Sequence, residues 1–181
     1  MIFRKGGRVN RNIRFIYKGH VLEIVSKFTY LGIVFTTGGS VNTFFEMLAG
    51  QALKAIFKLK SNLLKFLGIT VQHKLDLFDK LILPILNYGS EVWGLNDSTK
   101  LEGIHNIICK HILAFRGQTQ NNFVYGELGR TSLKSRRVVN VIKYWLKSVQ
   151  LDITKFASLM YRTLDNNPTH MSWARHVKTL G

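Results

Sequence analysis

The first part of the chain has the alternating apolar pattern that is typical of β-structure. Segment 28–35 is the clearest example, with Thr29, Leu31, Ile33 and Phe35 at one set of alternate positions and Phe28, Tyr30, Gly32 and Val34 at the other. Because successive side chains of a strand point to opposite faces, the segment predicts one strand that is apolar on both faces. The glycine inside it favours either a bulge or tight bend in a core strand, or the close approach of a ligand or another backbone.

Three further strands are predicted before this segment, at 1–5, 11–18 and 21–24. The first ends at the glycine pair 6–7, and a turn at 18–20 joins the other two as a hairpin. The chain therefore predicts a small N-terminal antiparallel β region of three to four strands.

From residue 40 onward the apolar residues recur at helical spacing. Helices are predicted at 43–66, 70–88, 99–115, 122–128, 132–149, 154–166 and 171–180. Thr43 with Glu46, and Thr99 with Glu102, have the spacing of a capping box, with Ser40 as an alternative start for the first helix. Pro84 predicts a kink in the second helix. The fold class is therefore α+β, with the β region followed by a mostly α-helical layer of five to six helices.

The helical periodicity also predicts which side chains are buried. In helix 43–66 the buried face is predicted to contain Ala49, Ala52, Leu53, Ile56, Leu59, Leu63 and Phe66. In helix 99–115 it contains Leu101, Ile104, Ile108, Ile112 and Phe115. In helix 132–149, Val138, Val141, Ile142, Trp145 and Val149 are expected inside, and Lys134, Arg136, Arg137 and Lys143 outside. Trp93 is expected to pack against the core, with base stacking as the alternative.

The charge balance points to an anionic partner. The chain has 181 residues, 46% of them hydrophobic, and a formal net charge of +16. Nucleic acid is the commonest partner of so basic a protein. A solubilising surface and an anionic membrane surface are the alternatives, but no stretch reaches the roughly 20 apolar residues of a spanning helix. We therefore expect nucleic acid and no membrane among the partners.

Two groups of basic residues are candidates for phosphate contacts. Residues 1–20 contain six basic side chains and no acidic one, namely Arg4, Lys5, Arg8, Arg11, Arg14 and Lys18. In helix 43–66, Lys54, Lys58 and Lys65 lie at i, i+4 and i+11 and form one stripe. A solvated surface is the alternative for both groups, but in residues 1–20 the lack of counter-charges favours phosphate contacts.

The sequence lacks the residues of a catalytic or metal site. The acidic residues are scattered, and there is no phosphate-binding loop or nucleophile elbow. Asp76 and Asp79 lie one turn apart without a third ligand, and His105 with the single cysteine, Cys109, cannot form a zinc finger. The single cysteine also excludes an internal disulfide framework and fits an intracellular protein of the cytoplasm or nucleus, since the first residues lack a signal peptide.

Several segments, in this order, resemble LINE-type (non-LTR) retrotransposon reverse transcriptases. They are IFRKGG at 2–7, YLG at 30–32, FTTGG at 35–39, ALKAI at 52–56, LPILNYGSEVWG at 83–94, IH at 104–105 with CK at 109–110, and YGELGR at 125–130. In that family these segments follow the catalytic palm, and the Asp-Asp pair of the palm is missing here. The resemblance implies three regions: a palm-end and primer-grip segment at 1–39, a thumb-like region at 40–95 and a connector at 96–181.

The resemblance also implies roles for particular residues. The backbone of Tyr30, Leu31 and Gly32 would support the sugar-phosphate at the primer terminus. Lys54, Lys58 and Lys65 would contact backbone phosphates, and the basic strands with Arg4, Arg11 and Arg14 would add non-specific affinity. The partners would be an RNA or DNA template–primer and the rest of the reverse transcriptase. No cofactor is expected in this chain, because Mg²⁺ would belong to the missing palm, and the chain alone is expected to be catalytically inactive.

A different class of function remains open from the same residues. A small basic helical module that binds RNA or DNA in its own right, or that serves as a protein adaptor, would have the same charge and helices. Preference for a recessed 3′ end favours the grip, whereas salt-sensitive binding without such a preference favours the generic module.

Overall fold

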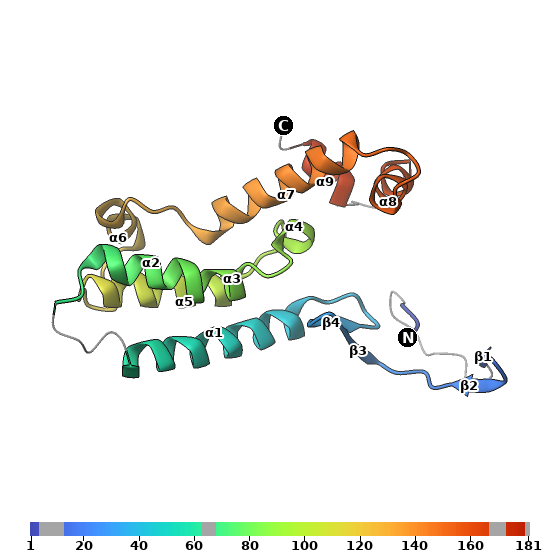
Figure 1. Cartoon of the computed structure of the whole chain (residues 1–181), viewed down its shortest axis with the longest axis horizontal. Coiled ribbons are helices and arrows are strands. Elements are labelled where there is room, and N and C mark those ends of the chain that lie inside the picture. Colours follow the sequence, from blue (N-terminus) through green and yellow to red (C-terminus); the bar gives the residue numbers. More distant parts are fainter. Residues whose placement is uncertain (4–12, 63–67, 167–172, 180–181) are drawn as a thin grey trace. The chain divides into compact units, whose positions relative to one another are not determined.

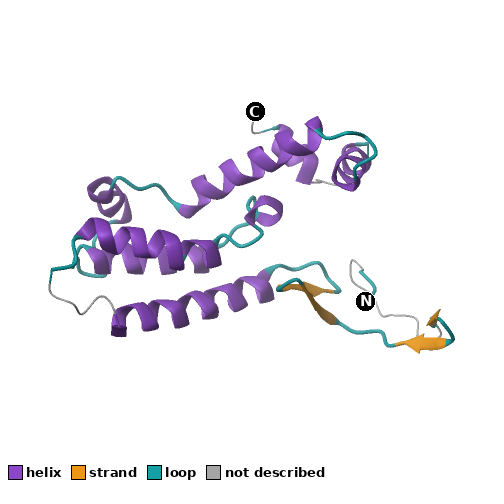
Figure 2. Ribbon diagram, viewed as in Figure 1, coloured by secondary structure: helices purple, strands orange, loops and turns teal. Residues whose placement is uncertain are grey.

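The computed structural model describes residues 1–3, 13–62, 68–166 and 173–179 (Figure 1). The chain separates into two compact units, Met1–Met47 and Leu48–Gly181, and each is described by itself. The boundary between them falls inside helix α1 (Asn42–Asn62). Unit 1 holds the strands and unit 2 holds the other helices (Figure 2).

Unit 1 contains two antiparallel hairpins, which form two separate two-stranded sheets in the described part of the chain. The first pairs β1 (Phe15–Tyr17) with β2 (His20–Leu22), and the second pairs β3 (Lys27–Tyr30) with β4 (Ile33–Thr36). Each turn has two residues, of which the second is glycine, and in both turns both residues have positive φ. Two positive φ values in a two-residue turn are the mark of type I′, whose twist matches that of the flanking strands.

The prediction of one continuous strand over 28–35 is wrong. The chain reverses at Leu31 and Gly32, with φ values of 47° and 75°, so the segment is a hairpin. The reversal also changes the faces. Phe28 pairs with Phe35 and Tyr30 with Ile33, so these four apolar side chains share one face, and Thr29 and Val34 share the other.

The other predicted strands are shorter than expected or displaced. Residues 13 and 14 precede β1, and residues 23 and 24 follow β2, without strand structure. Residues 1–3 are not in a strand, and the rest of the predicted strand 1–5 lies outside the described residues. The turn at Lys18 and Gly19 is confirmed.

Helix α1 begins near the alternative start at Ser40. The Ser40 hydroxyl accepts a hydrogen bond from the backbone N–H of Asn42 at 3.3 Å, and Thr43 lies inside the helix instead of at its cap. Ala52, Ile56 and Leu59 are buried as predicted, whereas Leu53 is exposed. The predicted end of the helix at 63–66 lies outside the described residues.

The predicted helix 70–88 is interrupted at its proline. Thr70 caps α2 (Val71–Leu81) as expected, accepting from the N–H of His73. Pro84 lies in the first turn of a separate short helix, α3 (Leu83–Leu86), where its missing N–H costs nothing. A further short helix, α4 (Ser90–Trp93), follows Gly89, which has a φ of 67°.

The remaining helices follow the predicted order. They are α5 (Thr99–Ile112), α6 (Asn121–Leu128), α7 (Leu133–Gln150), α8 (Phe156–Asp165) and α9 (Trp173–Lys178). Gly129 ends α6 with a φ of 59°, and the Ser132 hydroxyl caps α7 by accepting from the N–H of Ser135. In α5, Leu101, Ile104, Ile108 and Ile112 are buried as predicted.

Helix α7 is rotated from its predicted orientation. Val141 is buried as expected, but Val149 is exposed, and Arg137, expected outside, is 1% exposed. The rotation follows from the close packing of α7 on α4. A Cβ atom on Gly94, which ends α4, would lie 2.9 Å from Cγ2 of Val141 and 3.1 Å from Cβ of Arg137, so only glycine allows this approach.

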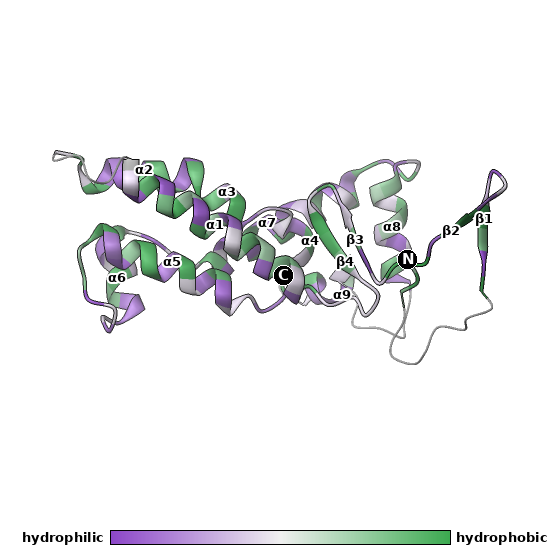
Figure 3. Ribbon diagram, turned by 90° about the horizontal axis from the view of Figure 1, so that it is seen from below, coloured by the Kyte–Doolittle hydropathy of each residue, from purple (hydrophilic) through white to green (hydrophobic). Residues whose placement is uncertain are grey.

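The predicted α+β class, with a small N-terminal antiparallel region followed by helices, is confirmed. The described residues form nine helices, of which α3 and α4 are four-residue pieces separated by the breaks near Pro84 and Gly89. Strongly hydrophobic residues (green in Figure 3) occur both in the hairpins and along the helices.

Candidate nucleic-acid interface

The predicted grip residues form the tip of the β3–β4 hairpin. Tyr30 ends β3, Leu31 and Gly32 make the turn, and all three are exposed. Leu31 is 71% exposed and has a φ of 47°. A left-handed conformation costs a residue with a side chain about 1–2 kcal/mol. The tip thus combines backbone strain with an exposed apolar side chain.

The predicted lysine stripe lies on the exposed side of α1. Lys54 and Lys58 are one helical turn apart, both are exposed, and neither is in an ion pair within the described residues. The sequence has five lysines and no acidic residue between Glu46 and Asp76. Lys65 lies outside the described residues.

Sequence reasoning missed Phe57 on the same side of this helix. Its side chain is 69% exposed and lies between Lys54 and Lys58 in sequence. Gly50, two turns earlier, has no atom within 4 Å of the place where a Cβ would be, so it leaves that side of the helix open. The sequence does contain a signal for this exposure, because Phe57 falls outside the apolar repeat of Ala52, Ile56 and Leu59 that marks the buried face.

The N-terminal arginines are only partly described. Arg14 is exposed next to β1, whereas Arg4 and Arg11 lie outside the described residues. Arg14 and the hairpin tip belong to unit 1, and Lys54 and Lys58 to unit 2. The structure therefore brings Tyr30, Leu31 and Gly32 together, and separately Lys54 and Lys58.

The segment LPILNYGSEVWG is a packing element. Trp93 is buried as predicted, and its Nε1 donates to the carbonyl oxygen of Tyr88 at 2.8 Å. The Oγ of Ser90 accepts a hydrogen bond from Asn140 of α7 at 3.0 Å. Each of these contacts fixes α4 against its neighbours, so the segment holds the fold of unit 2 together.

A buried arginine joins this segment to α5 and α7. The Arg137 guanidinium donates to Oδ1 of Asn87, to the carbonyl oxygen of Leu86 and to Oγ of Ser98, and it lies 5.0 Å from the centre of the Trp93 ring. Burial lowers its pKa to about 10. The guanidinium is therefore satisfied within the protein and is not available to phosphate.

Glu102 does not form the predicted capping box with Thr99, since α5 begins at Thr99 with Ser98 at the cap. Its carboxylate instead accepts from the N–H groups of Leu133 and Lys134, at 3.0 and 3.2 Å, where α7 begins. The hydroxyl of Tyr125 donates to the same carboxylate at 2.8 Å. Burial alone would raise the pKa of Glu102, but its hydrogen bonds with His105, Tyr125 and the backbone N–H of Leu133 lower it to about 2. The carboxylate is thus an inter-helix cap.

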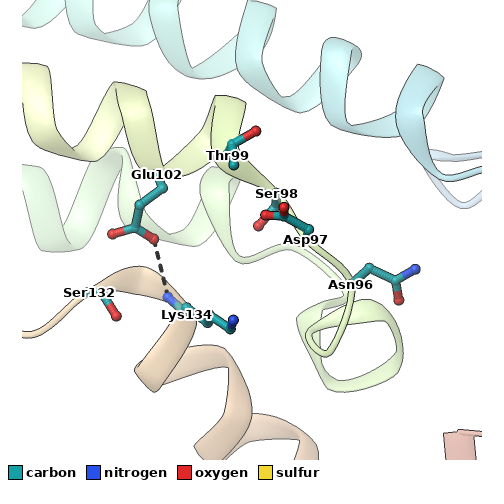
Figure 4. Close-up of a pocket in the computed structure, with 7 residues that line it drawn as sticks. All are labelled: Asn96, Asp97, Ser98, Thr99, Glu102, Ser132 and Lys134. Carbon is teal, nitrogen blue, oxygen red and sulfur yellow. Dashed lines mark hydrogen bonds between the residues drawn. The ribbon is translucent and has the colours of Figure 1, made fainter.

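A cavity of about 250 Å³ opens beside this carboxylate (Figure 4). It is lined by Asn96, Asp97, Ser98, Thr99, Glu102, Ser132 and Lys134. The two lining groups that bear most on its chemistry are already engaged, Glu102 with α7 and Ser98 with Arg137. Neither Glu102 nor Ser98 is therefore free to act as a catalytic group in this cavity.

The buried histidine and cysteine of α5 are core residues. The His105 ring stacks between the rings of Phe78 and Tyr125, with centroid distances of 5.5 and 5.4 Å. Cys109 is fully buried, and burial raises the pKa of its thiol to about 11. Within the described residues no three His, Cys, Asp or Glu side chains are grouped so as to hold a metal ion.

The comparisons with known proteins give no relative. No protein-family model, no curated protein and no solved structure matches this chain. Among the described residues, no helix has the length and apolar character needed to cross a membrane.

Proposed function

We propose that this chain is the post-palm part of a LINE-type reverse transcriptase, and that it holds the primer end and the template–primer duplex without polymerising nucleotides by itself. Its partners are then an RNA or DNA template–primer and the rest of that polymerase. It would act in the cytoplasm or nucleus, where such a template–primer is found. The proposal rests on the ordered resemblance of its segments and on two exposed groups of residues.

The conformation of Leu31 is the observation that carries the grip. A turn with two positive φ values favours Asn or Gly at its first position. Here an apolar residue occupies that position and is exposed. Backbone strain at residues other than glycine is concentrated at functional sites. An apolar tip beside Tyr30 suits contact with the sugar of a primer terminus.

Lys54 and Lys58 supply the duplex contacts in this proposal. Exposed lysines one turn apart on a helix reach neighbouring phosphates of one strand, and each such contact releases counterions. Phe57 between them offers an apolar surface to the sugars.

The test compares two pairs of lysines with the same spacing. Lys54→Gln with Lys58→Gln is expected to weaken duplex binding and to reduce the slope of log K against log salt by about 2. The matched control is Lys143→Gln with Lys147→Gln, an exposed pair on α7, which is expected to change binding little. Fluorescence anisotropy with a recessed 3′ end, a blunt duplex and a single strand measures both affinity and preference.

The result for Lys143 and Lys147 on α7 also tests the alternative function, a stand-alone basic binding module. The sequence has six basic residues and no acidic one between Glu127 and Asp152, and Lys143 and Lys147 are exposed. If substitution of either pair weakens binding equally, and the protein shows no preference for a recessed end, the stand-alone binding module is favoured over the grip. Primer extension by the purified chain would contradict the proposal that it is catalytically inactive.

A further inference from the structure

The β1–β2 hairpin exposes a row of ring side chains that the proposed grip does not use. The register pairs Phe15 with Leu22 and Tyr17 with His20, so these four side chains lie on one face of the hairpin. Phe15 is 48% exposed and Tyr17 is 62% exposed, and His20 is exposed as well. Unit 1 therefore does not bury this face by itself. We propose that it is a stacking platform for single-stranded nucleic acid, with one base on Phe15 and a neighbouring base on Tyr17.

The spacing of the rings favours a single strand over a duplex. Residues two apart in a strand are separated by about 7 Å along the strand. Bases in a stacked strand rise by only about 3.4 Å per nucleotide, so two neighbouring bases can each lie on a ring only after they separate from each other. Bases of a single strand can be splayed in this way, whereas those of a duplex remain hidden in the stack.

The charges of the hairpin favour nucleic acid over an apolar protein surface. Arg14 precedes β1 and Lys18 follows it, so cations flank both ends of the row, and the ammonium group of Lys18 lies 5.6 Å from the centre of the Tyr17 ring. Residues 1–27 contain seven basic side chains and one acidic side chain, Glu23. Basic residues interleaved with exposed aromatic rings are the combination that binds single strands without sequence preference.

The inference shares the class of partner with the proposed function, but it concerns a different surface and a different form of the nucleic acid. In the complete complex the platform would hold an unpaired stretch of template. Loss of the platform should therefore leave duplex binding by Lys54 and Lys58 intact.

The experiment replaces the rings while keeping the residues apolar. In the full chain, Phe15→Leu with Tyr17→Leu is expected to weaken the binding of a fluorescent oligothymidylate by roughly tenfold or more, and to leave duplex binding unchanged. Phe15→Tyr with Tyr17→Phe keeps both rings and should bind like the wild type. Val21→Thr, on the opposite face of the same hairpin, is the matched control and should also bind like the wild type.

Three results would overturn the platform. They are single-strand binding by the leucine variant that equals the wild type, a loss of the same size in the Val21→Thr variant, and an equal loss for single strand and duplex. The last two would indicate a role of the hairpin in folding or in docking to a protein. If the glutamine substitutions at Lys54 and Lys58 do not weaken duplex binding, while the protein still binds single strands, the proposed grip is refuted and the platform is not.

Discussion

Phe28 lies directly opposite Phe35 across the β3–β4 hairpin, although the two are seven positions apart and a continuous strand would place them on opposite faces. The reversal at Leu31 and Gly32 causes this pairing. It gathers Phe28, Tyr30, Ile33 and Phe35 on one face. It also means that the stability of the tip depends on how well its two residues suit the turn type.

The turn predicts opposite effects for its two residues. Gly32→Ala places a side chain at a φ of 75° and is expected to destabilise the hairpin by about 1–2 kcal/mol. Leu31→Asn is expected to stabilise it, because Asn-Gly is the preferred pair for a type I′ turn. NMR can follow both through the cross-strand contact between Thr29 and Val34, which the register places opposite each other.

The same asparagine variant separates folding from function. If Leu31 contacts the primer end, the Leu31→Asn variant should have a more stable hairpin but should lose the preference for a recessed 3′ end. An unchanged preference would mean that the side chain of Leu31 has no part in the grip.

Two glycines are expected to respond in opposite ways to a methyl group. A Cβ on Gly94 would lie 2.4 Å from the carbonyl oxygen of Ser90 and 2.9 Å from Cγ2 of Val141, so Gly94→Ala should destabilise unit 2 by about 1–3 kcal/mol. Gly103, inside α5, has no atom within 4 Å of such a Cβ, so Gly103→Ala should stabilise the protein by up to about 1 kcal/mol. Urea unfolding of both variants measures the difference, and equal midpoints would show that α4 does not approach α7 this closely.

Arg137 is expected to be important for stability in spite of its charge. Arg137→Ala removes the donors to Asn87, Ser98 and Leu86 and leaves a buried space above Trp93, at an expected cost of about 2–4 kcal/mol. Lys134→Ala on the exposed side of the same helix should change the free energy of unfolding by less than about 0.5 kcal/mol. A mild effect at Arg137 in thermal or urea unfolding would contradict its burial.

The lowered pKa of Glu102 predicts acid sensitivity. Its pKa is about 2 in the folded protein against its ordinary value of 4.5, so the unfolded chain binds more protons between these values. The stabilisation is therefore complete above about pH 4.5 and is lost as the pH falls towards 2.

Glu102→Gln should remove this part of the pH dependence and lower stability at neutral pH. Asp97→Asn, at an exposed carboxylate that lines the same cavity, is the control. Urea midpoints measured across the acid range compare the two variants with the wild type. An unchanged slope in the glutamine variant would show that another carboxylate is responsible.

Local signals along the chain were sufficient for most helices. Thr70 and Ser132 cap α2 and α7, Gly129 ends α6, and the kink predicted at Pro84 is found as a break between α2 and α3. Each of these residues acts through the backbone of its own few neighbours. The burial of Trp93 also followed from its place after a helix end. The exposure of Lys54 and Lys58 followed from helical periodicity alone.

Only the tertiary structure decided which distant groups meet. An apolar run such as 28–35 fits a strand or a hairpin, and Leu-Gly is a weaker turn signal than Asn-Gly, so the reversal was not evident. Glu102 has the spacing to cap its own helix, but α7 offers its carboxylate two N–H groups from residues 31 and 32 positions away. Arg137 is charged and sits in a polar stretch, yet the packing of α7 on α4 turns it inward, where carbonyl and hydroxyl oxygens from two other segments, the end of α3 and the start of α5, satisfy it. Periodicity specifies which residues share a face of a helix, whereas the partner of that face depends on the whole fold.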